Sequence, residues 1–173
     1  MMNWCGSRMQ NRKEVYKMSK ILVAYFSASG VTRKMANKLA VLADADTYEI
    51  KPEVLYSKAD LNWMDKNSRS SIEMSNKSMR PAIIKEELDL AKYDTILLGF
   101  PIWWYVAPTI INTFLESYDF TSKRIVLFAT SGGSGFGNTV NELKGSAKDA
   151  IITEGILLNN ASDKKIKEFI ENL

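Results

Sequence analysis

The chain of 173 residues contains no histidine and only one cysteine, Cys5. Without histidine it cannot build a hydrolase that relies on a histidine base, nor most zinc sites. A single cysteine excludes an internal disulfide framework. No apolar run approaches the roughly 18 to 20 residues that span a bilayer, and residues 1–17 lack the hydrophobic core of a secretory signal. We therefore expect a cytoplasmic protein that has neither a membrane partner nor a metal site.

The chain also has little net charge outside its first residues. Its net charge is +3, and residues 1–17 hold four basic residues against one acidic residue, so the other 156 residues are neutral, with 19 of each sign. A nucleic-acid-binding protein carries its basic excess on the folded body, so no nucleic-acid partner is expected. We interpret residues 1–17 as a disordered extension, or as the result of a misplaced start site, before one domain over residues 18–173. A basic tail for an acidic partner is the alternative.

Short apolar runs alternate with helical patterns from Lys20 onward. Strand-length runs occupy residues 21–26, 47–50, 95–98, 124–129 and 151–158. Helical patterns occupy residues 31–43, 108–118, 138–147 and 163–173. Runs that are apolar throughout indicate strands covered on both faces, and their alternation with helices indicates right-handed crossovers. The pattern predicts an α/β fold with a parallel, doubly wound sheet.

A polar insertion, residues 51–81, separates the second predicted strand from the third. A connection of this length inside a compact domain is usually functional or disordered. Trp63, Arg69 and Met74 favour an ordered segment. We predict a short helix over residues 68–74 within it, capped by Asn67.

The first strand is followed by the sequence SASGVT, residues 27–32. Ligands of open parallel sheets bind beyond the carboxyl ends of the strands. Gly30 permits a tight turn, the neighbouring backbone N–H groups can converge, and Ser27, Ser29 and Thr32 add hydroxyl groups, which together predict a phosphate cup at a helix start. A turn that only caps the helix would have the same pattern. Neither the P-loop lysine nor the G-x-G-x-x-G pattern is present, so a terminal monophosphate fits best.

Two further loops follow predicted strands. The sequence GFPIWWYVAP, residues 99–108, contains Trp103, Trp104 and Tyr105 in succession. Aromatic residues here usually belong to the core, but three in succession cannot all point inward, and an exposed one can stack on a planar ligand. The sequence TSGGSGFG, residues 130–137, is either flexible or lets a ligand approach the backbone closely. A cup, an aromatic wall and a backbone rim together describe a site for flavin mononucleotide (FMN).

The opening ILVAYFSASGVT and the loop GFPIWWYVAP resemble the flavodoxin-like family, especially its short bacterial flavodoxins, and the resemblance extends over residues 20–173. It implies a three-layer sandwich, with a five-stranded parallel sheet of order 2-1-3-4-5 and helices on both faces. It also implies that the FMN phosphate is held by Ser27, Ala28, Ser29, Gly30, Val31 and Thr32. One side of the isoalloxazine ring would face Pro101, Ile102, Trp103, Trp104 and Tyr105. The pyrimidine edge of the ring would contact Ser131, Gly132, Gly133, Gly135, Phe136 and Gly137.

Three features depart from the pattern of this family. Val31 stands where relatives often have a polar residue, and Tyr105 stands where glycine often follows the paired tryptophans. The neutral body also differs from that of the well-known electron carriers, which are strongly acidic. Acidic steering toward a basic redox partner is therefore not expected.

From these features we expect an FMN-binding redox protein in which the flavin, rather than a catalytic side chain, supplies the chemistry. An uncharged glycine loop favours low-potential electron transfer with a redox partner protein or a small-molecule electron acceptor. A small FMN-dependent NAD(P)H:quinone-type reductase is the alternative, and a non-redox phosphate-sensing module is a third. Trp63, Arg69 and Glu73 are candidates for the pocket. If Arg69 or Lys66 reaches the isoalloxazine ring, its positive charge would raise the reduction potential of the flavin. Arg69 could instead form a structural ion pair.

Overall fold

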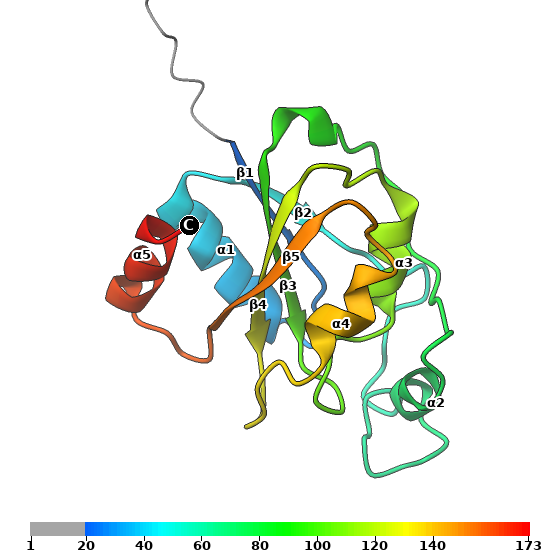
Figure 1. The fold of residues 1–173 in the computed structure, drawn as a ribbon. Helices are drawn as coiled ribbons and strands as arrows, with labels where there is room; N and C mark the ends of the chain where they lie inside the picture. Colours follow the sequence, from blue (N-terminus) through cyan, green and yellow to red (C-terminus); the bar gives the residue numbers. More distant parts are fainter. Residues whose placement is uncertain (1–19) are drawn as a thin grey trace, which may run out of the picture.

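The sheet is the centre of the fold. A computed structural model describes residues 20–173, so the extension predicted for residues 1–17 lies outside the described part of the chain. Five parallel strands are hydrogen-bonded in the order β2-β1-β3-β4-β5, which confirms the predicted topology (Figure 1). Their bounds are β1 Ile21–Tyr25, β2 Asp46–Glu49, β3 Thr95–Pro101, β4 Arg124–Thr130 and β5 Ile151–Leu157.

Helices cover both faces of the sheet. Helices α1 (Val31–Ala43) and α5 (Asp163–Glu171) lie on one face, and α3 (Ile110–Ser117) and α4 (Thr139–Lys144) lie on the other (Figure 1). The insertion contains α2 (Arg69–Ser75), which lies beyond the carboxyl ends of the strands. A short 3₁₀ helix, η1 (Leu90–Lys92), precedes β3. The arrangement is the predicted three-layer sandwich.

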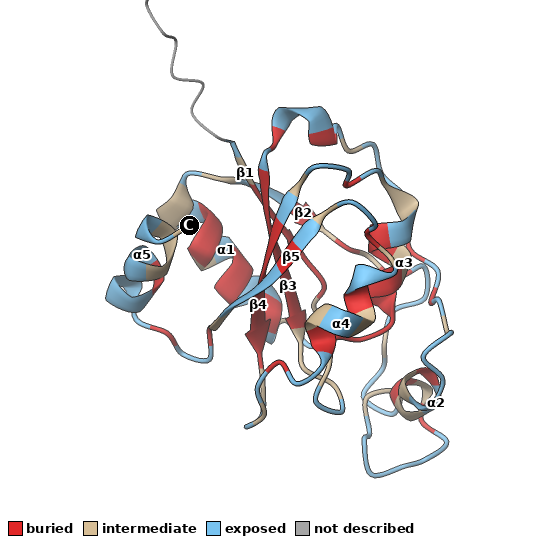
Figure 2. Cartoon of the chain, viewed as in Figure 1, coloured by how far each residue is buried: buried red, intermediate tan, exposed pale blue. Residues whose placement is uncertain are grey.

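The core has two apolar layers because successive strand residues point to opposite faces. Val23 and Tyr25 pack with α1 and α5, whereas Leu22, Ala24 and Phe26 pack with α3 and α4. The central strands are buried along their length (Figure 2). The expectation of strands covered on both faces is wrong for the two edge strands, β2 and β5, where most residues are exposed or half-buried because the sheet ends there.

The predicted elements all occur, but several boundaries differ. Strand β3 continues to Pro101, beyond the predicted end at residue 98. The predicted cap of α2 is wrong: Ser68, not Asn67, caps the helix, because its Oγ accepts a hydrogen bond from the Ser71 N–H at 3.3 Å. The N–H of Asn67 instead donates to Asp65 Oδ1 at 2.9 Å, which closes the turn before the helix.

Candidate functional site

The loop after β1 forms a cup at the start of α1. Gly30 has φ of 90°, in the left-handed region that glycine adopts without steric cost. Its N–H donates to Ser27 Oγ at 3.1 Å, so this hydroxyl closes the loop upon itself. The first turn of α1 has no side-chain cap and no acidic residue. The unpaired N–H groups of this turn and the positive end of the helix dipole therefore remain available to an anion.

The hydroxyl groups of the cup differ in burial and in hydrogen bonding. Ser29 is exposed at the rim of the loop. Thr32 is buried, and its Oγ1 lies 2.8 Å from Thr130 Oγ1 at the end of β4. This contact ties the first strand-end loop to the fourth strand. Of the three predicted hydroxyl donors, Ser29 is the one that is both exposed and not engaged within the cup.

The loop after β3 is a tight hairpin turn over residues 103–106. The Trp103 N–H donates to the Val106 carbonyl at 2.9 Å, and the Val106 N–H donates back to the Trp103 carbonyl at 3.1 Å. The two central residues, Trp104 and Tyr105, have φ of 46° and 69°. This is the pattern of a type I′ turn, in which glycine and asparagine are usual.

The three aromatic residues of this loop have different environments. Trp103 is partly buried and packs edge-on against Phe26 and Tyr56, with ring centroids 5.8 and 5.4 Å apart. Trp104 is 42% exposed and Tyr105 is 71% exposed. The prediction that at least one of the three is exposed is confirmed.

The glycine loop after β4 is shaped by one serine. Ser131 Oγ accepts hydrogen bonds from the N–H groups of Gly133 and Ser134, at 3.1 and 2.8 Å. The Ser131 N–H donates to Asn159 Oδ1 at 2.9 Å, so a residue from the loop after β5 supports the rim. Asn159 has no local sequence signal for this role, because it lies 28 residues from Ser131 in the chain.

The end of the glycine loop contacts the core and the turn at residues 103–106, which we call the aromatic turn. Gly137 has φ of 52°, and a Cβ placed there would lie 2.3 Å from the carbonyl oxygen of Tyr105. Phe136 is buried and packs edge-on against Phe100 at a centroid distance of 6.3 Å. These two residues support the loop from below rather than face the open side of the site.

The loops after β1, β3 and β4 and the insertion together surround an open cavity of about 880 Å³. Ten of the predicted residues line it: Ala28, Ser29, Trp63, Pro101, Ile102, Trp103, Trp104, Tyr105, Gly132 and Gly133. Leu61, Ser70 and Ser134 also line it. The predicted residues that do not line it are Ser27, Gly30, Val31, Thr32, Arg69, Glu73, Ser131, Gly135, Phe136 and Gly137. No side chain of the lining carries a formal charge.

The insertion is anchored beneath this cavity by a buried polar cluster. Glu73 accepts hydrogen bonds from Tyr56 Oη at 2.6 Å and from Arg69 Nε at 2.7 Å. Arg69 Nη1 also donates to the Val54 carbonyl at 2.6 Å, and the guanidinium lies 3.9 Å from the centre of the Tyr56 ring. Burial, together with the hydrogen bond to Glu73, raises the pKa of Tyr56 far above its usual value. Arg69 is therefore in a structural ion pair, and Lys66 is absent from the cavity lining.

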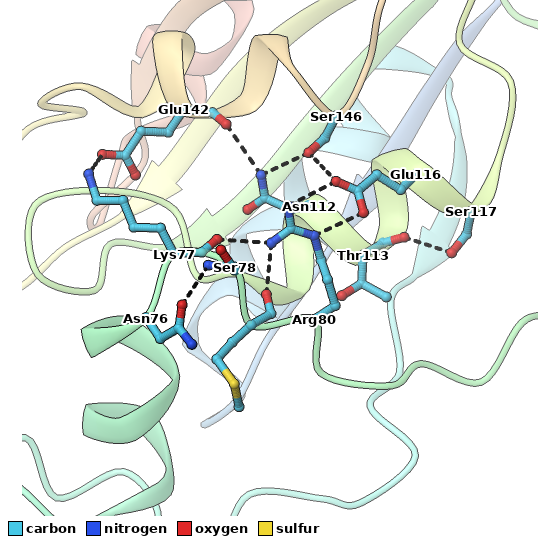
Figure 3. A network of polar contacts seen from close by, with 11 residues as sticks. Asn76, Lys77, Ser78, Arg80, Asn112, Thr113, Glu116, Ser117, Glu142 and Ser146 are labelled. Carbon is cyan, nitrogen blue, oxygen red and sulfur yellow. Dashed lines mark hydrogen bonds and ion pairs between the residues drawn. The ribbon is translucent and has the colours of Figure 1, made fainter.

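A second polar network joins the end of the insertion to α3 and α4 (Figure 3). Arg80 donates from Nε and Nη2 to the two carboxylate oxygens of Glu116, at 2.9 and 3.0 Å, and Ser146 Oγ donates to the same carboxylate. These hydrogen bonds, above all those from Arg80, lower the pKa of Glu116. Lys77 forms an ion pair with Glu142. A smaller cavity of about 220 Å³ lies beside this network and shares Trp104 with the larger one.

Within residues 20–173, no cluster of three or more acidic, cysteine or histidine residues could hold a metal ion. The helices in this part of the chain are also too short or too polar to cross a membrane.

Comparison with known proteins identifies the family. A family model described as flavodoxin matches residues 20–173. A candidate flavoprotein from Bacteroides eggerthii is 47% identical; the match covers 89% of this chain and 97% of that protein, with a TM-score of 0.83. A Lactobacillus acidophilus flavoprotein, solved in complex with FMN, is 27% identical over 85% of this chain and 98% of that protein, with a TM-score of 0.64.

A more distant similarity is to the NAD(P)H dehydrogenase (quinone) 1 of Rattus norvegicus. The two are 26% identical over an alignment of 117 positions, and the match covers 54% of this chain and 43% of the rat enzyme. The chain thus spans less than half the length of this curated relative. The family model, by contrast, covers the whole described domain, and the chain belongs to the flavodoxin family.

Proposed function

We propose that the chain binds FMN and transfers electrons at low potential. The residues present fit this cofactor: the uncapped first turn of α1 suits a phosphate dianion, and the cavity with Trp103 and Trp104 suits a flat ring system. The Lactobacillus acidophilus flavoprotein that binds FMN supports the same cofactor here. When bound, FMN supplies the electron-transfer chemistry, and the chain supplies position and electrostatics.

The proposal of a low reduction potential rests on one observation: no side chain that lines the cavity carries a formal charge. Negative charge that develops on the ring during reduction is stabilised by nearby cations and destabilised when none is present. Arg69 directly precedes the lining residue Ser70, but its donors are engaged by Glu73 and Val54. The polar groups of the lining are uncharged, and they include the hydroxyl groups of Ser29, Ser70 and Ser134.

A spectroscopic and potentiometric experiment tests this function. The purified protein, supplied with FMN, should show the visible absorption of a bound flavin, and its midpoint potential should lie below that of free FMN. A midpoint above that of free FMN would contradict the electrostatic argument. Failure to bind FMN at all would contradict the proposed function as a whole.

Ser29→Asp tests the position of the phosphate. A carboxylate at this exposed position would repel the phosphate dianion, so we expect an affinity loss of at least about tenfold for FMN. Riboflavin, which lacks the phosphate, should lose much less. Ser78→Asp, at an exposed position outside the cavity lining, is the matched control and should leave the affinity for FMN unchanged. An equal loss for FMN and riboflavin would place the phosphate elsewhere.

A second candidate function is an FMN-dependent NAD(P)H:quinone-type reductase. The similarity to the rat quinone dehydrogenase favours it. Steady-state oxidation of NADPH by the FMN-loaded protein, with a quinone present, separates the two functions. Turnover supports the reductase, and its absence supports a carrier that a partner protein reduces. Membership of the flavodoxin family argues against the phosphate-sensing alternative.

A further inference from the structure

A positively charged surface lies on the face of the sheet that α1 and α5 cover (Figure 1). All six cations of these two helices contribute to it: Arg33, Lys34, Lys38, Lys164, Lys165 and Lys167. We call these six residues the basic face. Three carboxylates lie among them, Glu49, Asp163 and Glu168, so the net charge of this surface is +3.

Half of the cations of the basic face have no counter-ion. Within residues 20–173, Lys34, Lys165 and Lys167 form no ion pair, and all three are exposed. Lys38 lies 2.7 Å from Asp163 and also donates to a backbone carbonyl of the loop before α5, so it joins the two helices. Unpaired surface lysines are solvated, but their summed charge still raises the potential that an approaching molecule meets.

The basic face borders the site because both helices begin at loops that build it. The loop before α1 is the cup. The loop before α5 contains Asn159, which supports the glycine loop through Ser131. None of the six cations lines the cavity, so they face an approaching partner rather than the ring.

The opposite end of the sheet is acidic. The segments that lead into the strands, together with Glu171 at the end of α5, hold nine carboxylates against six cations, a net charge of −3; they are Lys20 and residues 44–46, 85–94, 119–124 and 148–149. The Tyr93 hydroxyl donates to Asp46 at 2.7 Å, which joins two of these segments. The neutral domain is therefore a charge dipole whose positive end borders the site.

Neither the insertion nor the cofactor reverses this polarity. The insertion holds six cations and four carboxylates, and Glu142 and Glu116 pair with Lys77 and Arg80, so it adds no net charge. A phosphate monoester in the cup contributes about −1.5 to −2 charges. The basic face, at +3, therefore stays positive when FMN is bound.

We propose that the basic face is the docking surface for an acidic electron-transfer protein. The proposal rests on the proposed function, because the partner would exchange electrons with bound FMN. Charge complementarity selects the partner: free lysines beside the site attract surface carboxylates and repel a basic protein. The attraction acts over about 8–10 Å at physiological ionic strength, so charges that border the site dominate the final approach.

Oxidation of the reduced, FMN-loaded protein by two small probes reads the charge beside the site. Ferricyanide is a trianion and hexaammineruthenium(III) is a trication, and each takes one electron, so two equivalents oxidise one reduced flavin and its protons pass to water. In stopped-flow mixing, the ferricyanide rate constant should fall at least about threefold between about 10 and 300 mM NaCl. The hexaammineruthenium(III) rate constant should rise or stay constant. The opposite pair of salt dependences would overturn the basic face.

Two triple variants separate local charge from total charge. Lys34→Glu with Lys165→Glu and Lys167→Glu should reverse both salt dependences. Lys20→Glu with Lys92→Glu and Lys148→Glu changes the total charge equally at exposed positions of the opposite end and should preserve them. An equal effect of both variants would mean that only the total charge matters and would overturn the proposal.

Binding gives a readout independent of electron transfer. A plant-type ferredoxin, an acidic iron–sulfur protein, should shift or broaden the NMR signals of Lys34, Lys165 and Lys167 at low salt, and a basic cytochrome c should not. The first triple variant should weaken ferredoxin binding at least about tenfold. Absence of these shifts, or tighter binding of a DNA duplex than of ferredoxin at the same residues, would overturn the protein partner. Failure of the proposed function is separate, since it appears as absent FMN binding, while the titration can be read on the FMN-free protein.

Discussion

Replacing Glu73 should destabilise the fold more than replacing any exposed carboxylate of an ion pair. The side chain of Glu73 is 6% exposed and accepts hydrogen bonds from Tyr56 and Arg69, so Glu73→Ala leaves a buried phenol and a guanidinium without their acceptor. Breaking a buried ion pair from one side costs about 3–5 kcal/mol. The Arg69 side chain remains 24% exposed and water can partly solvate it, so we expect the lower value, about 3 kcal/mol.

For a domain of this size, that loss lowers the thermal midpoint by about 6 to 12 °C. Urea denaturation, followed by circular dichroism, measures the free energy of unfolding directly. Glu86→Gln is the matched control, because Glu86 pairs with Lys51 where both side chains are more than 40% exposed. We expect that control to lose less than about 1 kcal/mol. A loss below about 1 kcal/mol for Glu73→Ala would refute the view that the cluster anchors the insertion.

A triple replacement distinguishes the loss of an anchor from the exposure of unpaired polar groups. In Tyr56→Phe, Arg69→Met and Glu73→Leu combined, no donor of the cluster is left without its acceptor. Apolar replacements of buried ion pairs are often neutral or stabilising. The triple variant should therefore recover most of the stability that Glu73→Ala loses. If it is as unstable as Glu73→Ala, the specific geometry of the cluster, rather than the unpaired charge, carries the stability.

Three further substitutions test other parts of the structure. Gly30→Ala should lower the free energy of unfolding by about 1 kcal/mol, because φ at this position is 90°. The loss comes from the backbone alone, since no atom lies within 4 Å of the new Cβ, and urea denaturation measures it. Gly137→Ala should cost about 1–3 kcal/mol and alter the near-ultraviolet circular dichroism of the aromatic turn, since its Cβ would meet the Tyr105 carbonyl oxygen. Burial, with the hydrogen bond to Asp46, raises the pKa of Tyr93 to about 12. Because the folded state holds this proton more tightly, Tyr93 contributes stability below pH 10 that is lost as the pH rises toward 12. Tyr93→Phe should flatten that alkaline decline, and an unchanged slope would contradict the assignment.

The fold was predictable because its main signals are local in sequence. Each buried strand is a continuous apolar run, and the helices between them keep an apolar face, so the two periods identify the layers. The cup was predictable for the same reason: Gly30 and the start of α1 lie within a few residues of each other. Cap positions were less predictable. Asn67 and Ser68 are both good capping residues, and the choice between them depends on which one the preceding turn engages.

The insertion and the aromatic turn were less predictable because their geometry depends on distant partners. Ser70 reaches the cavity because Arg69 and Glu73 pack against Tyr56, more than a dozen residues earlier in the chain. The left-handed turn has none of the usual sequence signals, since Trp-Tyr occupies the positions that Asn-Gly normally occupies. Its conformation is fixed from outside by Gly137, in a loop that follows another strand. Sequence patterns report local preference, and here tertiary contacts override it.

The distribution of charge in the insertion connects the stability of the fold with the chemistry of the site. Three of its cations form ion pairs: Arg69 with Glu73, Lys77 with Glu142 and Arg80 with Glu116. None of these cations lines the larger cavity, although Lys77 and Arg80 line the smaller one. The pairs of Lys77 and Arg80 join the insertion to α4 and α3. The same contacts that hold the insertion in place therefore keep these three cations out of the lining of the larger cavity. Removing one of these carboxylates, for example by Glu73→Gln, would both loosen the insertion and leave the Arg69 guanidinium without its counter-ion. Stability and reduction potential should then change together, with the potential rising as the fold weakens.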